Sequence, residues 1–152
     1  MRVILQRVSK ASVLVNNNIV GNINKGILVL VGFTDTDTSK EIDYLVDKIV
    51  NLRIFNDSNG VMNKSLKDVN GSILSVSQFT LYADTSRGRR PSYIKALNGD
   101  RAVILYDEFN RKIKEAGINV ETGIFGADMQ VSLINDGPVS IIIERENKNG
   151  EK

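Results

Sequence analysis

The feature of this sequence that most constrains its fold is the apolar run Gly26-Ile27-Leu28-Val29-Leu30-Val31-Gly32-Phe33. A run of strand length with no alternating polar positions is typical of a strand that is buried on both faces. Other elements must then cover both faces, so the chain has to build layers around this segment. We therefore expect a central strand at residues 26–33.

Other segments predict the strands that accompany it. Val3, Leu5 and Val8 stand among polar residues, which is typical of a first strand and not of a signal peptide. A short turn is expected to separate this strand from the next one. The remaining predicted strands cover residues 11–15, 72–82, 129–133 and 139–143, and the last two are joined by a turn at 135–138.

Two helices are also expected. Thr38 and Glu41 have the spacing of a capping box, and apolar residues follow them at helical intervals. The second helix is predicted from about residue 99 to 116, where Gly117 is well placed to end it. We expect one α/β domain over residues 1–145, with a β-rich three-layer arrangement of mixed layered sheets and both helices packed on one side. Residues 146–152 are expected to form a polar C-terminal tail.

The chain contains no histidine and no cysteine. This excludes a histidine base, a cysteine nucleophile, a disulfide framework and a thiolate zinc site. Asp35, Asp37 and Glu41 come closest to an all-oxygen metal site, but a solvated loop that leads into a helix explains them better. We therefore expect no metal and no cofactor. No apolar run approaches the ~20 residues of a membrane span, so no membrane partner is expected, and a cytoplasmic location fits.

The segment Ser75-Val76-Ser77-Gln78-Phe79-Thr80-Leu81-Tyr82 places hydroxyl and amide groups at the end of a predicted strand. Ligands often bind at such ends, although an ordinary strand terminus would have the same pattern. A nucleophilic Thr80 would need a neighbouring base, and the segment contains no histidine, lysine or carboxylate.

Basic residues concentrate between Arg87 and Arg101, where five basic residues accompany a single acidic one. Arg87, Arg89 and Arg90 suit bidentate contacts with phosphate, so this loop predicts an anionic partner. A solvated basic loop is the alternative.

A third segment, Asn135-Asp136-Gly137-Pro138-Val139-Ser140, consists largely of turn formers. A plain β-turn explains these residues. The other interpretation is a rigid backbone device, because a fold can hold a Gly–Pro bond in the cis form.

Taken together, these segments resemble the D-aminoacyl-tRNA deacylases, also called D-tyrosyl-tRNA deacylases. The similarity covers most of the chain and is carried by Leu5-Gln6-Arg7-Val8, residues 26–32, Arg53-Ile54-Phe55, Ser77-Gln78-Phe79-Thr80-Leu81, Ala83-Asp84-Thr85, Arg90-Pro91-Ser92, residues 127–133 and Asn135-Asp136-Gly137-Pro138-Val139. The family releases free D-amino acid and tRNA from D-aminoacyl-tRNA and so proofreads the chirality of the attached amino acid.

The resemblance implies a homodimer in which Gly137 and Pro138 of one subunit, joined by a cis peptide, enter the active site of the other. Ser77, Gln78, Phe79 and Thr80 would form the catalytic pocket, supported by three further residues: Arg7, Met129 and Asn135. Arg87, Arg89 and Arg90 would contact tRNA phosphates. Three positions depart from what the family usually has: Tyr82, Tyr93 and Ser140.

The family's RNA-assisted mechanism explains how a chain without histidine could work. An aminoacyl ester is already activated, and the 2′-hydroxyl of the terminal ribose lies beside it. The resemblance thus implies rejection of L-aminoacyl-tRNA and, because glycine has no side chain to reject, cleavage of glycyl-tRNA. The alternative is a non-catalytic RNA-binding protein that uses residues 87–101.

Overall fold

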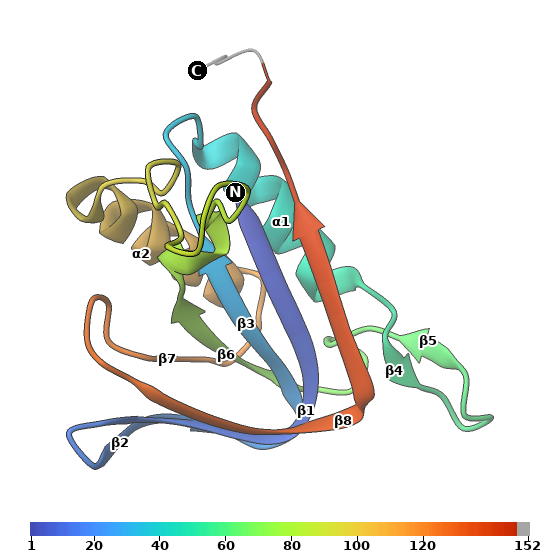
Figure 1. Ribbon diagram of the computed structural model, residues 1–152. Coiled ribbons are helices and arrows are strands. Elements are labelled where there is room, and N and C mark those ends of the chain that lie inside the picture. The colour runs from blue at the N-terminus through green and yellow to red at the C-terminus, as the bar shows by residue number, and fades with distance from the viewer. Residues whose placement is uncertain (149–152) are drawn as a thin grey trace.

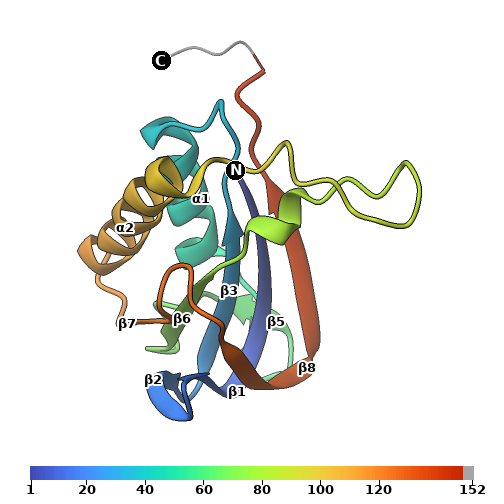
Figure 2. The same cartoon turned by 60° about the vertical axis from the view of Figure 1, so that its left-hand side comes forward.

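The computed structural model describes residues 1–148, and these form a mixed sheet with two α-helices on one side (Figures 1 and 2). The main sheet has the order β2-β1-β3-β6-β7. Strand β8 lies off this order and pairs antiparallel with residues 2–14 of β1. The strands of this sheet are β1 (Arg2–Val15), β2 (Asn18–Ile23), β3 (Gly26–Gly32), β6 (Ser72–Ser77), β7 (Val120–Thr122) and β8 (Gln130–Glu144). A separate hairpin consists of β4 (Phe55–Asn56) and β5 (Met62–Lys64).

The predicted central strand is confirmed as β3, which lies between β1 and β6. It is antiparallel to β1 and parallel to β6. Ile27, Val29 and Val31 belong to a core shared with the helices. Leu28 belongs to a second core that includes Val13 of β1. Covering β3 on both faces therefore produces the layered α/β architecture that the sequence predicts.

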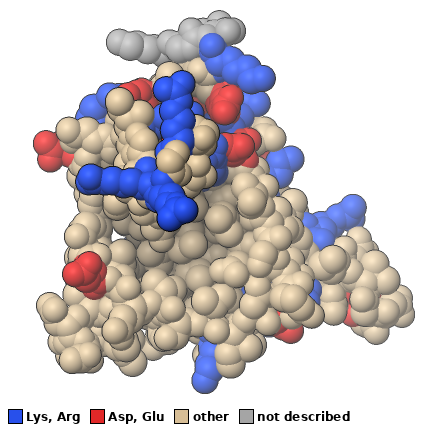
Figure 3. Space-filling view, in the orientation of Figure 1, with Lys and Arg blue, Asp and Glu red and all other residues tan. Residues whose placement is uncertain are grey.

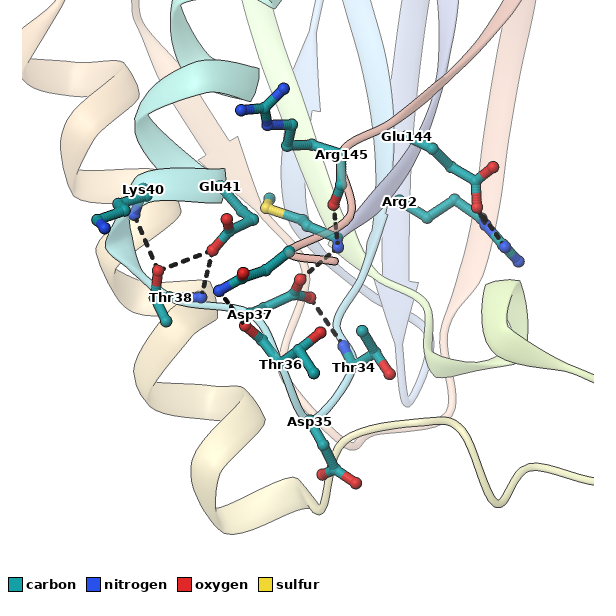
Figure 4. A network of polar contacts seen from close by, with 12 residues as sticks. Arg2, Thr34, Asp35, Thr36, Asp37, Thr38, Lys40, Glu41, Glu144 and Arg145 are labelled. Atoms are coloured by element: carbon teal, nitrogen blue, oxygen red, sulfur yellow. Dashed lines mark hydrogen bonds and ion pairs between the residues drawn. The ribbon is translucent and has the colours of Figure 1, made fainter. Parts of the chain in front are cut away.

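The helices are α1 (Ser39–Asn51) and α2 (Gly99–Glu115). The predicted capping box begins α1, because Glu41 accepts hydrogen bonds from the Thr38 N–H at 2.8 Å and from the Thr38 hydroxyl at 2.7 Å (Figure 4). The predicted second helix is also confirmed, and Gly117 follows its end with a φ of +88°. None of the helices in residues 1–148 is long and apolar enough to cross a bilayer.

Two of the three acidic residues expected in a solvated loop are buried, so that interpretation is wrong for Asp37 and Glu41. The Asp37 carboxylate pairs with the ammonium group of Met1 and accepts a 2.8 Å hydrogen bond from the Thr34 N–H (Figure 4). Burial raises the pKa of Asp37, although these two contacts oppose the shift. The partner of Asp37 is thus distant in sequence, and no local pattern could reveal it.

Three strand predictions need correction. Residues 2–15 form one strand and not two, because β1 continues through the exposed Ser9 and Lys10 with a register shift beside them. Residues 130–144 likewise form the single strand β8, which bends at residues 135–139 where two separate strands were expected. The predicted strand at 72–82 stops at Ser77, and Phe79–Tyr82 form a short 3-10 helix, η1. The tail prediction extends over residues 149–152, which lie outside the described residues.

Candidate active site

A cavity of about 580 Å³ opens where β6 ends and the chain turns into η1. The Gln78 N–H donates to the Val31 carbonyl at 2.7 Å, which fixes the turn against the end of β3. Gly32 allows this close approach, because a Cβ atom there would lie 2.9 Å from the Gln78 carbonyl oxygen. As a result Ser77, Gln78 and Phe79 all line the cavity.

Residues from distant parts of the chain complete the cavity wall. Met129, which the resemblance implied, lines it together with Asp128. Gly123 leaves room for Met129, since a Cβ atom there would lie 2.4 Å from its sulfur. The sequence did not reveal the remaining apolar and aromatic lining, which comes from the segment before α2, from α2 itself and from the loop before β8: Tyr93, Ala96, Leu97, Ala102 and Phe125.

The backbone at the start of η1 presents two N–H groups, those of Phe79 and Thr80. Neither donates to an acceptor within residues 1–148, as is usual in the first turn of a helix. The Thr80 hydroxyl accepts a hydrogen bond from the Gln78 amide. Thr80 is exposed and, unlike the three residues before it, does not line the cavity.

The only charged side chain in the cavity lining is that of Asp128. It forms no ion pair with the described residues. Asp128 lies in the loop before β8, far in sequence from the segment 75–82, and no sequence pattern predicted it as a site residue. Within residues 1–148, no three acidic side chains gather to hold a metal.

Beneath the cavity, Tyr106 of α2 supports the end of β6. Its hydroxyl donates to the Ser75 carbonyl at 2.8 Å, and the Gly123 N–H donates to the same oxygen at 3.1 Å. Burial raises the pKa of Tyr106, which keeps its hydroxyl protonated at neutral pH. The strand that carries Ser77 is therefore anchored two residues before Ser77.

A second group of predicted site residues gathers at the bend of β8. Gln6 and Val8 of β1 pair with Ser140 and Asn135 respectively, so the residues between them in β8 bulge out of the ladder. The Asn135 carboxamide spans the bulge, because its oxygen accepts from the Val139 N–H at 2.7 Å and its nitrogen donates to the Ser140 hydroxyl at 3.0 Å. The hydroxyl of Ser140, where the family usually has threonine, is thus used within the bend.

Arg7 holds this bend from below and is only 7% exposed. Its Nε donates to the Asp136 carbonyl at 2.7 Å, and its Nη1 donates to the Ile54 carbonyl at 2.7 Å. One guanidinium group therefore ties the bend to the base of the β4–β5 hairpin. The Gly137–Pro138 peptide above it is cis, and Gly137 has a φ of +141°.

The two groups of predicted residues lie apart within one chain. Figures 1 and 2 show the bend of β8 at one end of the sheet and η1, in light green, towards the other. None of the residues 135–139 lines the cavity. The structure therefore brings Ser77, Gln78, Phe79 and Met129 together, and it separately brings Arg7 and Asn135 to Gly137–Pro138.

The basic loop projects from the body of the protein beyond η1 (Figure 2). Asp84 and Ser92 close it by exchanging backbone hydrogen bonds of 2.8 and 2.9 Å. Arg87, Arg89 and Arg90 are all exposed between them, and lysine and arginine side chains gather on this face (Figure 3).

Tyr82 and Tyr93, two positions where this chain departs from the residues usual in the family that it resembles, have different surroundings. Tyr82 is buried beneath the guanidinium group of Arg2, 4.6 Å from its ring centroid, and it does not line the cavity. Burial raises the pKa of Tyr82 well above its ordinary value. Tyr93 does line the cavity, and its ring meets that of Phe79 edge to face.

Comparison with known proteins gives a consistent result. The profile of a family described as D-Tyr-tRNA(Tyr) deacylase matches residues 4–144. A protein of Flavobacterium psychrophilum named D-aminoacyl-tRNA deacylase is 57% identical over 97% of this chain and 99% of its own length. A protein of the same name from Bacillus pumilus is 58% identical over 93% of this chain and 96% of its own length.

Solved structures share the fold. One described as the c-Myc DNA Unwinding Element Binding Protein has a TM-score of 0.91 and 39% identity, covering 96% of this chain and 99% of that chain. Another, described as a probable eukaryotic D-amino acid tRNA deacylase, has a TM-score of 0.81 and covers 93% of this chain and 97% of that chain. At 22% identity, the second shows similarity of fold alone.

Proposed function

The chain belongs to the D-aminoacyl-tRNA deacylase family, described as D-Tyr-tRNA(Tyr) deacylase, and on this premise we propose how it selects and cleaves its substrate. It is a hydrolase that acts on the ester of D-aminoacyl-tRNA. The aminoacyl-adenosine end enters the cavity beside Ser77, Gln78 and Phe79. L-aminoacyl-tRNA is rejected.

The observation that carries the catalytic proposal is a pair of N–H groups, those of Phe79 and Thr80, that have no acceptor within residues 1–148 and lie where the chain leaves the cavity wall at Phe79. The chain offers no histidine that could act beside them. Donors that are already oriented can stabilise the oxyanion that forms when water attacks an ester. The N–H groups of Phe79 and Thr80 have this role. Stabilisation of the oxyanion by these groups requires no side-chain nucleophile. The Thr80 hydroxyl accepts a hydrogen bond from the Gln78 amide and is not the nucleophile in this proposal.

The proton acceptor is the 2′-hydroxyl of the terminal ribose. It takes a proton from the attacking water and gives its own proton to the departing 3′-oxygen, so the products are free amino acid and tRNA with both hydroxyls restored. Held next to the ester by the RNA itself, this group has a high effective concentration. The only carboxylate in the lining, Asp128, is the alternative acceptor.

Selection of D-amino acids is assigned to Gly137 and Pro138 of a partner subunit in a homodimer. These residues do not line the cavity of their own chain, which supports a second copy as their source. An L side chain would run into their backbone, whereas a D side chain would point away. Glycine presents no side chain, so glycyl-tRNA is also cleaved.

The basic loop contacts tRNA phosphates near the acceptor end. Arg87, Arg89 and Arg90 are exposed, and none of them pairs with a carboxylate within residues 1–148. Guanidinium groups that are free in this way suit the phosphate backbone.

A paired assay tests the proposal: release of labelled amino acid is measured from D-aminoacyl-tRNA and from the matching L-aminoacyl-tRNA. We expect rapid release from the first substrate only. Cleavage of both would contradict selection by Gly137 and Pro138. Cleavage of neither, with tRNA still bound, would favour the non-catalytic RNA-binding protein.

A further inference from the structure

Arg7 carries a buried positive charge that is surrounded mainly by neutral oxygens. Its one ion pair within residues 1–148, with the exposed carboxylate of Asp136, spans 4.0 Å. The carbonyl oxygens of Asp136 and Ile54 and the side-chain oxygen of Asn56 accept hydrogen bonds from the guanidinium group at 2.7, 2.7 and 3.3 Å respectively. A buried cation is costly unless acceptors are placed around it. These three oxygens therefore determine where the guanidinium group lies.

Two of the three oxygens belong to a segment whose position is set by its own contacts. Ile54 and Phe55 are buried in the core that β3 shares with the helices. Just beyond Asn56, the Asp57 carboxylate closes the turn of the β4–β5 hairpin by accepting two backbone hydrogen bonds of 2.8 and 3.0 Å. Asn56 is exposed, but its backbone is held between these two anchors. Its side-chain oxygen is therefore offered to Arg7 from a fixed position.

The other side of the guanidinium group faces the bend of β8. Arg7 stands opposite the bulge, between the residues of β1 that pair with Ser140 and Asn135. Its Nη2 lies 3.0 Å from the position that a Cβ atom would take on Gly137. Because the guanidinium group is planar and rigid, it holds the hairpin base and the bend at a fixed separation. Figure 1 shows the hairpin projecting beside this bend.

We propose that Asn56 is a positioning residue for chiral selection, which acts through Arg7 on Gly137 and Pro138. The inference rests on the proposed function, in which the backbone of this bend blocks an L side chain in the cavity of the partner subunit. Rejection by a clash is effective only while the blocking group cannot yield. Without the Asn56 oxygen, Arg7 loses one of its two acceptors on the hairpin, so the bend gains freedom to move and an L side chain is admitted.

The experiment compares kcat/KM of the full chain for matched D- and L-aminoacyl-tRNA. We expect Asn56→Ala to raise kcat/KM for the L substrate about tenfold and to lower that for the D substrate by less than about threefold, because small displacements of a positioning element change rates by up to about 100-fold. Asn56→Asp retains an oxygen acceptor for Arg7 and should restore the wild-type ratio of the two values.

The matched control is Asn63→Ala. Asn63 is exposed on the same hairpin and its side-chain oxygen also accepts from an arginine, but from Nη1 of Arg53 at 3.0 Å and not from Arg7. Its replacement should leave the ratio of the two kcat/KM values unchanged.

A double-mutant cycle tests whether Asn56 acts through Arg7. In an Arg7→Lys background, where no guanidinium group joins the hairpin to the bend, Asn56→Ala should change the ratio no further. An additive effect would overturn the proposal. So would an unchanged ratio in Asn56→Ala alone, with or without a lower Tm, and in that case the proposed function would stand. Failure of the wild type to hydrolyse D-aminoacyl-tRNA would refute the proposed function itself.

Discussion

Replacing Gly137 by alanine perturbs the bend of β8 at one atom. At a φ of +141° the new Cβ would lie 2.9 Å from Cγ2 of Val139 and 3.0 Å from Nη2 of Arg7. The backbone conformation costs a non-glycine residue about 1–3 kcal/mol. For a domain of this size, such a loss lowers Tm by roughly 2–12 °C. Room for the Cβ requires Val139 or Arg7 to move, so the bend is displaced as well as destabilised.

The assay combines thermal unfolding with kcat/KM for D- and L-aminoacyl-tRNA. We expect Gly137→Ala to lower kcat/KM for the D substrate by at least about tenfold, because small displacements of a positioning element are costly. Gly60→Ala is the matched control, since Gly60 has a φ of +75° but open space around the missing Cβ. It should lose about 1–2 kcal/mol of stability from the backbone alone and keep full activity. Wild-type activity and selectivity in Gly137→Ala would refute the role assigned to the bend.

Three further variants test other parts of the account. Thr80→Ala should keep most of the hydrolytic activity, because the N–H groups and not the hydroxyl stabilise the oxyanion; near-total loss in a single-turnover assay would make Thr80 the nucleophile. Replacing Arg87, Arg89 and Arg90 with glutamine should weaken tRNA binding and flatten its dependence on salt concentration, and unchanged values of both would exclude phosphate contacts. Burial alone would raise the pKa of Glu41, but hydrogen bonds from Thr38 outweigh burial and lower the pKa below the ordinary 4.5. The Glu41 carboxylate therefore stabilises the fold above pH 4.5. This contribution is lost as the pH falls through the lowered pKa. Glu41→Gln should cost about 1 kcal/mol at pH 7 and remove this pH dependence, as measured by urea unfolding between pH 3 and 7.

Sequence patterns correctly predicted the helices and strands that are determined by residues close together in the sequence. The run at 26–33 revealed β3 because burial on both faces leaves no polar position. Thr38 and Glu41 located the start of α1 because a capping box is formed within one turn. The same reasoning failed at residues 135–138, where turn-forming residues predicted the end of a strand. These residues bulge, but strand β8 continues beyond them. That outcome depends on β1, which pairs with both halves of β8 from the opposite end of the chain.

Part of the candidate cavity was also predicted. Ser77, Gln78 and Phe79 do lie at the end of β6 and line the cavity with Met129, and their catalytic role stays a prediction. Asp128 and Phe125 were missed, because only the tertiary fold brings the loop before β8 to the end of β6. The end of β6 was also placed too late, since the close approach of η1 depends on the absence of a side chain at Gly32.

The most direct test of a site that takes its proton acceptor from RNA is hydrolysis of D-aminoacyl-tRNA ending in 2′-deoxyadenosine, with the amino acid on the 3′-oxygen. Single-turnover rates should be compared with the ribose substrate for the wild type and for Asp128→Asn. The account predicts that the deoxy substrate binds but is hydrolysed at least about 100-fold more slowly, and that Asp128→Asn keeps most of its activity on the ribose substrate. Normal hydrolysis of the deoxy substrate, together with an inactive Asp128→Asn, would contradict it.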